Sequence, residues 1–145
     1  MAPPLFTIGY EGKTVDELLD RLLEAGVRLL IDVRAVAASR RPGFSKTALA
    51  AALTERGISY LHLRPLGTPK PGRDAARKGR IAEMHAIYET QLATPEAALA
   101  LEQAREAARE APAALLCFES DPACCHRTIV AERLAANRAF EIRDL

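Results

Sequence analysis

The segment that decides the fold is residues 115–127, LLCFESDPACCHR. It starts with apolar residues typical of a buried strand, turns at Asp121-Pro122 and predicts a helix from about His126. It also contains all three cysteines of the chain, together with two acids, a histidine and an arginine. Structural loops rarely need this mixture of side chains. We therefore interpret the segment as one wall of a functional site.

Strand and helix patterns alternate on both sides of this segment. Short apolar runs predict strands at residues 5–8, 28–33, 58–63, 113–118 and 140–142. Helical periodicity and capping signals predict helices at residues 15–25, 46–56, 81–92, 95–110 and 126–136. The alternation predicts a single-domain α/β fold over residues 1–145. We expect a Rossmann-like, three-layer structure with a mostly parallel sheet of about five strands and helices on both faces.

Residues 64–80 interrupt this alternation. They contain six cations against one acid, and their prolines and glycines disfavour regular structure. We expect a long basic loop whose residues 68–79 are among the least ordered of the chain. Such a loop can contact a nucleic-acid backbone. Charge runs are more often simply solvated, however, and no aromatic residue interleaves this one for base stacking.

The composition is that of a soluble globular protein. The 145 residues are 49% hydrophobic and 27% charged, and the net charge of +1 implies no general attraction to nucleic acid or membranes. No apolar stretch approaches the roughly 20 residues of a spanning helix, and residues 1–4 lack a signal-peptide pattern. An odd number of cysteines, two of them adjacent, favours reduced cysteines in the cytoplasm over a disulfide framework.

The predicted topology brings distant loops together. Right-handed crossovers place every strand-to-helix loop at the same edge of a parallel sheet, where ligands bind beyond the carboxyl ends of the strands. The loops of this kind are residues 9–11, 32–41, 64–80 and 119–127. We expect one cleft at this edge, lined by Gly9, Asp32, Arg34, Glu119, Cys125, His126 and Arg127.

Several short motifs are distributed along the chain. They are TIGY at 7–10, IDVR at 31–34, Ser39-Arg40 with Phe44 and Lys46, GISY at 57–60 with Leu66-Gly67, LCFE at 116–119 and CHR at 125–127. Together they resemble the domain of unknown function 488 (DUF488) family over nearly the whole chain. The resemblance implies a small cytosolic prokaryotic α/β protein with a polar site and a connection to nucleic-acid or nucleotide chemistry. The resemblance implies no particular enzymatic activity. The chain departs from the pattern at Cys124, beside Cys125, and at Thr68-Pro69.

The candidate catalytic residues are Glu119, Cys125 and His126. Glu119 ends an apolar strand and is the better candidate for a general base. A helix start favours the thiolate of Cys125, and the neighbouring His126 and Arg127 would lower its pKa further. The structural alternative is a half-buried cysteine that packs as a small hydrophobe. The spacing of cysteines and histidine argues against a metal site, and the sequence calls for no cofactor.

The candidate binding residues are Gly9, Tyr10, Asp32, Arg34, Arg40 and Arg127. Arg34, Arg40 and Arg127 would form an anion pocket at the start of the last helix. Arg127→Ala would then abolish anion binding at little cost in stability. Asp32 is interpreted as the partner that orients an arginine, and Tyr10 as a stacking or hydroxyl group. Each arginine has the alternative of a solvated charge or an ion pair.

Two functions of different class remain open. One is an enzyme that acts on an anionic substrate, such as a nucleotide or modified base, with Glu119 and Cys125 in the chemistry. The other is a non-catalytic module that binds phosphate or nucleic acid through the same arginines. The sequence leaves the substrate, the reaction, the oligomeric state and the strand order undetermined.

Overall fold

The computed structural model describes residues 2–119 and 126–145, and a five-stranded sheet lies at its centre. The strands are β1 (Pro4–Gly9), β2 (Leu29–Asp32), β3 (Ser59–His62), β4 (Ala113–Cys117) and β5 (Glu141–Asp144). Their order in the sheet is β3-β2-β4-β1-β5, and every neighbouring pair is parallel. The predicted α/β fold with a parallel sheet is confirmed.

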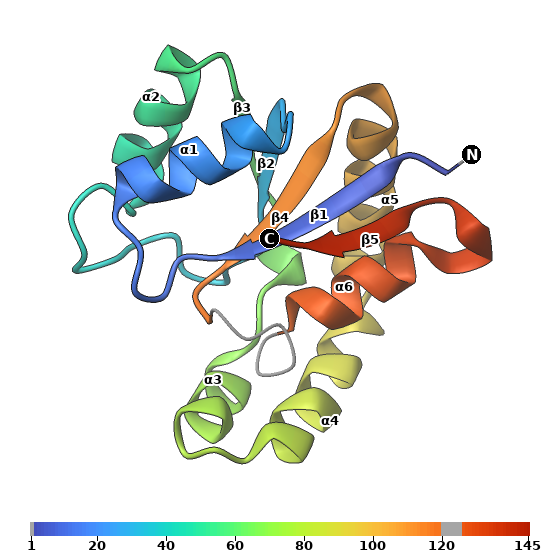
Figure 1. Ribbon diagram of the computed structural model, residues 1–145. Coiled ribbons are helices and arrows are strands. Elements are labelled where there is room, and N and C mark those ends of the chain that lie inside the picture. The colour runs from blue at the N-terminus through green and yellow to red at the C-terminus, as the bar shows by residue number, and fades with distance from the viewer. Residues whose placement is uncertain (1, 120–125) are drawn as a thin grey trace.

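Helices cover both faces of the sheet (Figure 1). The helices α1 (Val15–Glu24) and α2 (Lys46–Glu55) bury all their leucines except Leu23 on one face, against apolar side chains of β1, β2 and β4. The helices α5 (Pro95–Glu110) and α6 (Arg127–Leu134) pack on the other face, and α4 (Ile81–Leu92) adds Tyr88 and Leu92 to the same core. The result is the expected three-layer arrangement. A short 3-10 turn, η3 (Ala136–Arg138), leads from α6 to β5.

Burial follows the position of each strand in the sheet. All residues of β4 and β2 are buried, as strands covered on both faces require, whereas all four residues of the edge strand β5 are exposed. β4 lies between β1 and β2, so its carboxyl end is flanked by two other strand ends. The segment that follows β4 therefore meets the loops that follow β1 and β2.

The capping signals read from the sequence occur as predicted. The Thr14 hydroxyl accepts a hydrogen bond from the Glu17 backbone N–H at 3.1 Å, and the Glu17 carboxylate accepts one from the Thr14 N–H at 2.9 Å. This reciprocal pair is a capping box that fixes the start of α1. At the start of α5, the Thr94 hydroxyl accepts from the Ala97 N–H at 3.2 Å, and Pro95 takes the first helical position.

The expectation of a long loop at residues 64–80 was wrong. This stretch forms a 3-10 turn, η1 (Arg64–Leu66), and a helix, α3 (Lys70–Arg77). Pro71 sits in the first turn of α3, where a missing N–H costs nothing, and Gly79 follows the helix end at φ 76°. Gly72 is buried, and a Cβ at this position would lie 2.5 Å from Thr68 Cγ2 and 3.3 Å from Ile87 Cγ2. The residues that disfavour structure in general thus delimit α3 and pack it against α4.

None of the helices in the described part of the chain is both long and apolar enough to cross a membrane.

Candidate functional site

A cavity of about 470 Å³ opens between the carboxyl edge of the sheet and α3. One wall comes from the segments after β1, β2 and β4, and the opposite wall from α3 and α4, which lie beyond the strand ends at the bottom of Figure 1. Its lining residues are Tyr10, Glu11, Arg34, Ala35, Val36, Thr68, Arg73, Ala76, Arg77, Met84, Phe118, Glu119 and His126. We call this the site cavity. Its volume lies within the range of small-molecule sites.

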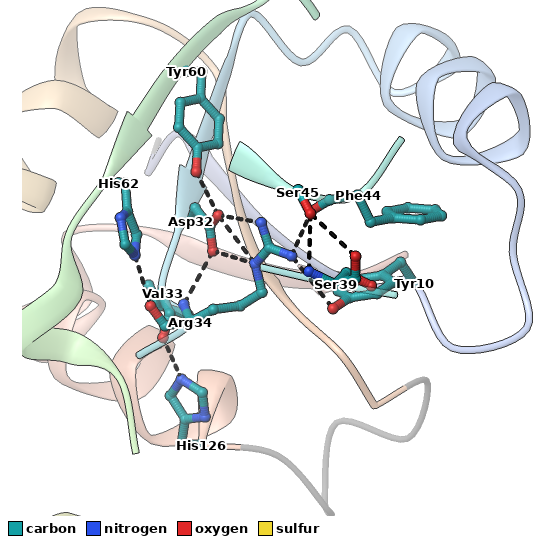
Figure 2. Close-up of polar contacts among 10 residues, drawn as sticks. All are labelled: Tyr10, Asp32, Val33, Arg34, Ser39, Phe44, Ser45, Tyr60, His62 and His126. Carbon is teal, nitrogen blue, oxygen red and sulfur yellow. Dashed lines mark hydrogen bonds and ion pairs between the residues drawn. The ribbon is translucent and has the colours of Figure 1, made fainter. Parts of the chain in front are cut away.

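Arg34, which lines the site cavity, forms an ion pair with the fully buried Asp32 (Figure 2). Arg34 Nε is 2.9 Å from Asp32 Oδ1, and Arg34 Nη2 is 2.7 Å from Oδ2. Asp32 also accepts hydrogen bonds from the Arg34 backbone N–H at 3.0 Å and from the Tyr60 hydroxyl at 2.6 Å. Burial by itself lowers the pKa of Arg34. The hydrogen bonds and the charge of Asp32 outweigh this effect and raise the pKa above its usual value, so Arg34 stays charged.

The remaining donors of Arg34 are directed into the protein. Its Nη1 donates to the Phe44 carbonyl at 2.7 Å and to the Tyr10 hydroxyl at 3.3 Å. The Arg34 side chain is 6% exposed, and His62 Nε2 holds the Arg34 carbonyl at 2.7 Å. Asp32 orients Arg34, as the sequence predicted. Most of the guanidinium is committed to this network, which leaves Arg34 little capacity to bind a ligand anion.

Three aromatic rings from distant segments form a cluster beside Arg34. Tyr10 stacks on Phe44 with ring centroids 4.5 Å apart, and Phe118 meets Tyr10 edge-on at 5.3 Å. The guanidinium of Arg41 lies 4.8 Å from the Phe44 centroid and donates to the carbonyls of Tyr10 and Lys13. Phe118 is 41% exposed and lines the site cavity. It offers an open apolar surface to a ligand.

Gly9 and Arg127 hold the segment after β4 against the end of β1. The Tyr10 and Glu11 N–H groups donate to the carbonyls of Cys117 and Phe118 at 3.2 and 2.7 Å. The Arg127 guanidinium donates to the Glu119 carbonyl and lies 3.4 Å from the Cys117 sulfur. Arg127 is fully buried and does not line the site cavity. Contrary to the sequence-based expectation, we therefore expect Arg127→Ala to destabilise the protein, because it removes a fully buried side chain and leaves the partly buried Glu119 carbonyl without this donor.

Gly9→Ala should destabilise the protein by about 1–3 kcal/mol, the usual cost of overfilling a packed site. A Cβ at Gly9 would lie 1.7 Å from the Glu119 carbonyl oxygen and 2.8 Å from Arg127 Nη1, so backbone must move. Amide hydrogen exchange should show faster exchange at Tyr10 and Glu11, whose bonds to residues 117 and 118 would lengthen. The amides of β3, on the far side of the sheet, serve as the internal control. Unchanged protection at residues 10 and 11 would contradict the expected rearrangement.

His126 is buried at the start of α6. Its Nε2 lies 2.6 Å from the Val33 carbonyl, so Nε2 carries the proton of the neutral ring and donates it to that oxygen. The ring also packs against Tyr88 with centroids 4.9 Å apart. Burial lowers the pKa of His126 to about 4; the bond to Val33 opposes this shift and the charge of Arg127 adds to it. His126 is therefore neutral at pH 7 and ties α6 to the end of β2.

Glu119 projects from the segment after β4 and lines the site cavity. Burial raises the pKa of Glu119 above its usual range, the nearby charge of Glu11 raises it further, and the Arg127 guanidinium partly offsets both. The sulfur of Cys117 lies 3.5 Å from Glu119 Oε2. Cys117 is disulfide-bonded, which departs from the expectation of reduced cysteines, so it has no thiol proton to donate to Glu119.

Helix α3 adds two arginines that the sequence analysis did not select. Arg73 and Arg77 both line the site cavity, because their four-residue spacing places them on one face of α3. Arg73 Nη1 donates to the Thr68 carbonyl at 2.9 Å, and Arg77 pairs with Asp74 at 3.1 Å. Pro71 near a helix start and the i, i+4 spacing were the signals for this face. They were overlooked because residues 64–80 were interpreted as a loop.

The predicted site residues fall into four groups. Tyr10, Arg34, Glu119 and His126 line the site cavity, whereas Gly9, Asp32 and Arg127 lie behind its lining at the same edge of the sheet. Arg40 is exposed and outside the lining. Cys125 lies outside the described residues. Within residues 2–119 and 126–145, no group of three or more histidine, cysteine or acidic side chains is placed to hold a metal ion.

Comparison with known proteins gives one match. The family model described as domain of unknown function DUF488 matches residues 14–134. This range includes β2, β3, β4 and all six α-helices. No curated protein and no solved structure gives a significant match.

Proposed function

The chain belongs to the DUF488 family, a domain of unknown function. From the geometry of the site cavity, we propose that it is an enzyme acting on a small anionic substrate in that cavity. Glu119 is the group that exchanges a proton with the substrate. Arg73 and Arg77 of α3 bind the anionic part. The single observation that carries the proposal is a carboxyl group of raised pKa that lines a cavity together with arginines.

The proton-transfer role rests on the surroundings of Glu119. A general acid or base works best when its pKa lies near the operating pH, and burial moves the pKa of Glu119 in that direction. The carboxylate of Asp32 contrasts with that of Glu119, because among the described residues it is bonded to the Arg34 guanidinium, the Arg34 N–H and the Tyr60 hydroxyl, which are all protein donors. Two carboxyl groups at one sheet edge thus have separate roles, one structural and one exposed to a ligand.

We assign anion binding to Arg73 and Arg77 of α3 in place of Arg34 and Arg127, the arginines selected from the sequence. Arg34 is held by Asp32, Phe44 and Tyr10, and Arg127 is buried behind the lining. Arg73 and Arg77 lie across the cavity from Glu119 and the aromatic cluster. A substrate that bridges the cavity would place its anionic group at α3 and an apolar or planar part against Phe118 and Tyr10. A nucleotide has both parts.

Glu119→Gln provides the test, with nucleoside monophosphates as the probe substrates. We expect the variant to bind these nucleotides like the wild type in thermal-shift titrations. Its turnover, measured by NMR of the substrate mixture, should fall by about 10²–10⁴-fold. Arg73→Gln should instead weaken binding. In a non-catalytic module, the wild type would bind the same nucleotides without converting any of them, and that result would exclude the enzyme.

The same variant has an expected effect without any substrate. A carboxyl of raised pKa destabilises the folded state once pH rises through that pKa, because the folded protein must then bury a carboxylate. Glu119→Gln should therefore raise the melting temperature at pH 7–8, and this gain should disappear at pH 4, where the wild-type carboxyl is protonated. Glu83→Gln, on the exposed face of α4, is the matched control. A lower melting temperature for Glu119→Gln at pH 7–8 would show that Glu119 is a structural partner.

A further inference from the structure

A second cavity of about 500 Å³ adjoins the site cavity. The two share a wall formed by Ala35, Val36 and Arg73. The second cavity extends along η1 and the start of α3 and reaches the start of α5, where Glu96 contributes to its lining. We call it the basic cavity. A ligand that fills the site cavity and continues past Arg73 would enter it.

Charge distinguishes the two cavities. The basic cavity is lined by Arg64, Lys70 and Arg73 against one carboxylate, that of Glu96. Arg64 and Lys70 are exposed, and among the described residues neither these two nor Arg73 has an acidic partner within ion-pair distance. In the site cavity, Arg34 is paired with Asp32 and Arg77 with Asp74. The cations without a carboxylate partner are therefore concentrated in the basic cavity.

Aromatic side chains, in contrast, line the site cavity and not the basic cavity. Phe118 and Tyr10 line only the site cavity, and Val36, which is 52% exposed, lies on the shared wall. Stacking surfaces at one end and cations at the other match a nucleotide base followed by a phosphate backbone. The net charge of +1 provides no general attraction, so the cations of η1 and α3 have to act locally.

We infer that the two cavities form one track for a single-stranded nucleic acid. The terminal nucleotide occupies the site cavity, with its base against Phe118 and its own phosphate at Arg73 and Arg77. The next two phosphates lie along Lys70 and Arg64 in the basic cavity. Concave sites of this size admit single nucleotides rather than a duplex. The inference rests on the proposed function and narrows its substrate from small anions to the end of a nucleic-acid strand.

Thymidine oligonucleotides of one to six residues, each with a 5′-phosphate, test this inference by calorimetry. Affinity should rise from one to three nucleotides and then level off. For single strands, the slope of log K against log salt is about −0.7 per phosphate contact. Loss of two contacts in Arg64→Ser/Lys70→Ser should therefore reduce the slope by about 1.4. Between 50 and 200 mM salt, the decline in affinity of the trinucleotide should become about sevenfold smaller than in the wild type.

The matched control is Arg28→Ser/Arg109→Ser. Arg28 precedes β2 and Arg109 lies in the last turn of α5, so this pair removes two exposed cations from the opposite edge of the sheet. It should leave the salt slope unchanged. Equal affinity for one and three nucleotides, with no effect of Arg64→Ser/Lys70→Ser, would overturn the track and leave the proposed function in place. Absence of binding by the mononucleotide and by every oligonucleotide would overturn both.

Discussion

Asp32→Asn should lower the free energy of unfolding by about 3–5 kcal/mol, as removal of one partner from a buried ion pair does. Asp32 is fully buried, and its carboxylate receives the Arg34 guanidinium, the Arg34 backbone N–H and the Tyr60 hydroxyl. An asparagine has the same shape but no charge, so it would leave the Arg34 cation buried without its counter-ion. Urea unfolding followed by circular dichroism measures the change.

Two controls separate the buried charge from simpler effects. Asp20→Asn breaks an exposed pair with Arg56 at 3.5 Å and should change stability by less than about 1 kcal/mol. Asp32→Asn/Arg34→Gln removes both charges and should be less destabilised than the sum of its single variants. Additive effects would mean that the pair does not act as a unit. A loss below about 1 kcal/mol for Asp32→Asn would contradict its assigned role.

Acidification should destabilise the fold by about 3 kcal/mol through His126 alone. The unfolded histidine has a pKa near 6.5, whereas burial lowers the pKa of the folded one to about 4. Between these values the unfolded chain takes up the proton and the folded chain does not, so stability is lost as pH falls from about 7 to 4. A difference of 2.5 pKa units corresponds to about 3 kcal/mol.

His126→Gln isolates this contribution. A glutamine amide can reach the Val33 carbonyl, as His126 Nε2 does at 2.6 Å, but it has no charged form. The stability of the wild type minus that of His126→Gln should fall by about 3 kcal/mol between pH 7 and pH 4, and the titrations of the carboxyl groups cancel in this difference. A difference that stays constant over this range would show that His126 becomes protonated inside the folded protein.

The layers of the fold could be predicted because their signals are local. The capping box of Thr14 and Glu17, and Thr94 with Pro95, mark helix starts within a few residues, and continuous apolar runs mark buried strands. Strand order was not predictable, because the pairing of β4 with β1 and β2 joins segments separated by more than 80 residues along the chain. Helix α3 was missed because Pro71, Gly72 and Gly79 were weighed by type rather than by position in a helix.

The location of the candidate site could be predicted from the sequence, but the availability of its side chains to a ligand could not. The crossover rule correctly brings Tyr10, Arg34, Glu119 and His126 to one edge, since it depends only on strand direction. It cannot tell which arginines are available to a ligand. That depends on hydrogen bonds such as Arg34 to the Phe44 carbonyl, and on the packing that turns Arg73 and Arg77 toward the cavity. The functional roles of all these residues remain predictions.

The central place of β4 has a consequence for the order of folding. β1 and β2 are separated in the sheet by a strand that lies about 80 residues after β2 in the chain. Before β4 is available, β2 can pair with β3, but β1 has no partner, since its neighbours are β4 and β5. Closing such long loops makes the transition state costly in entropy and folding slow. The insertion of β4 is thus the step that assembles the sheet and completes the cavity wall in the same event.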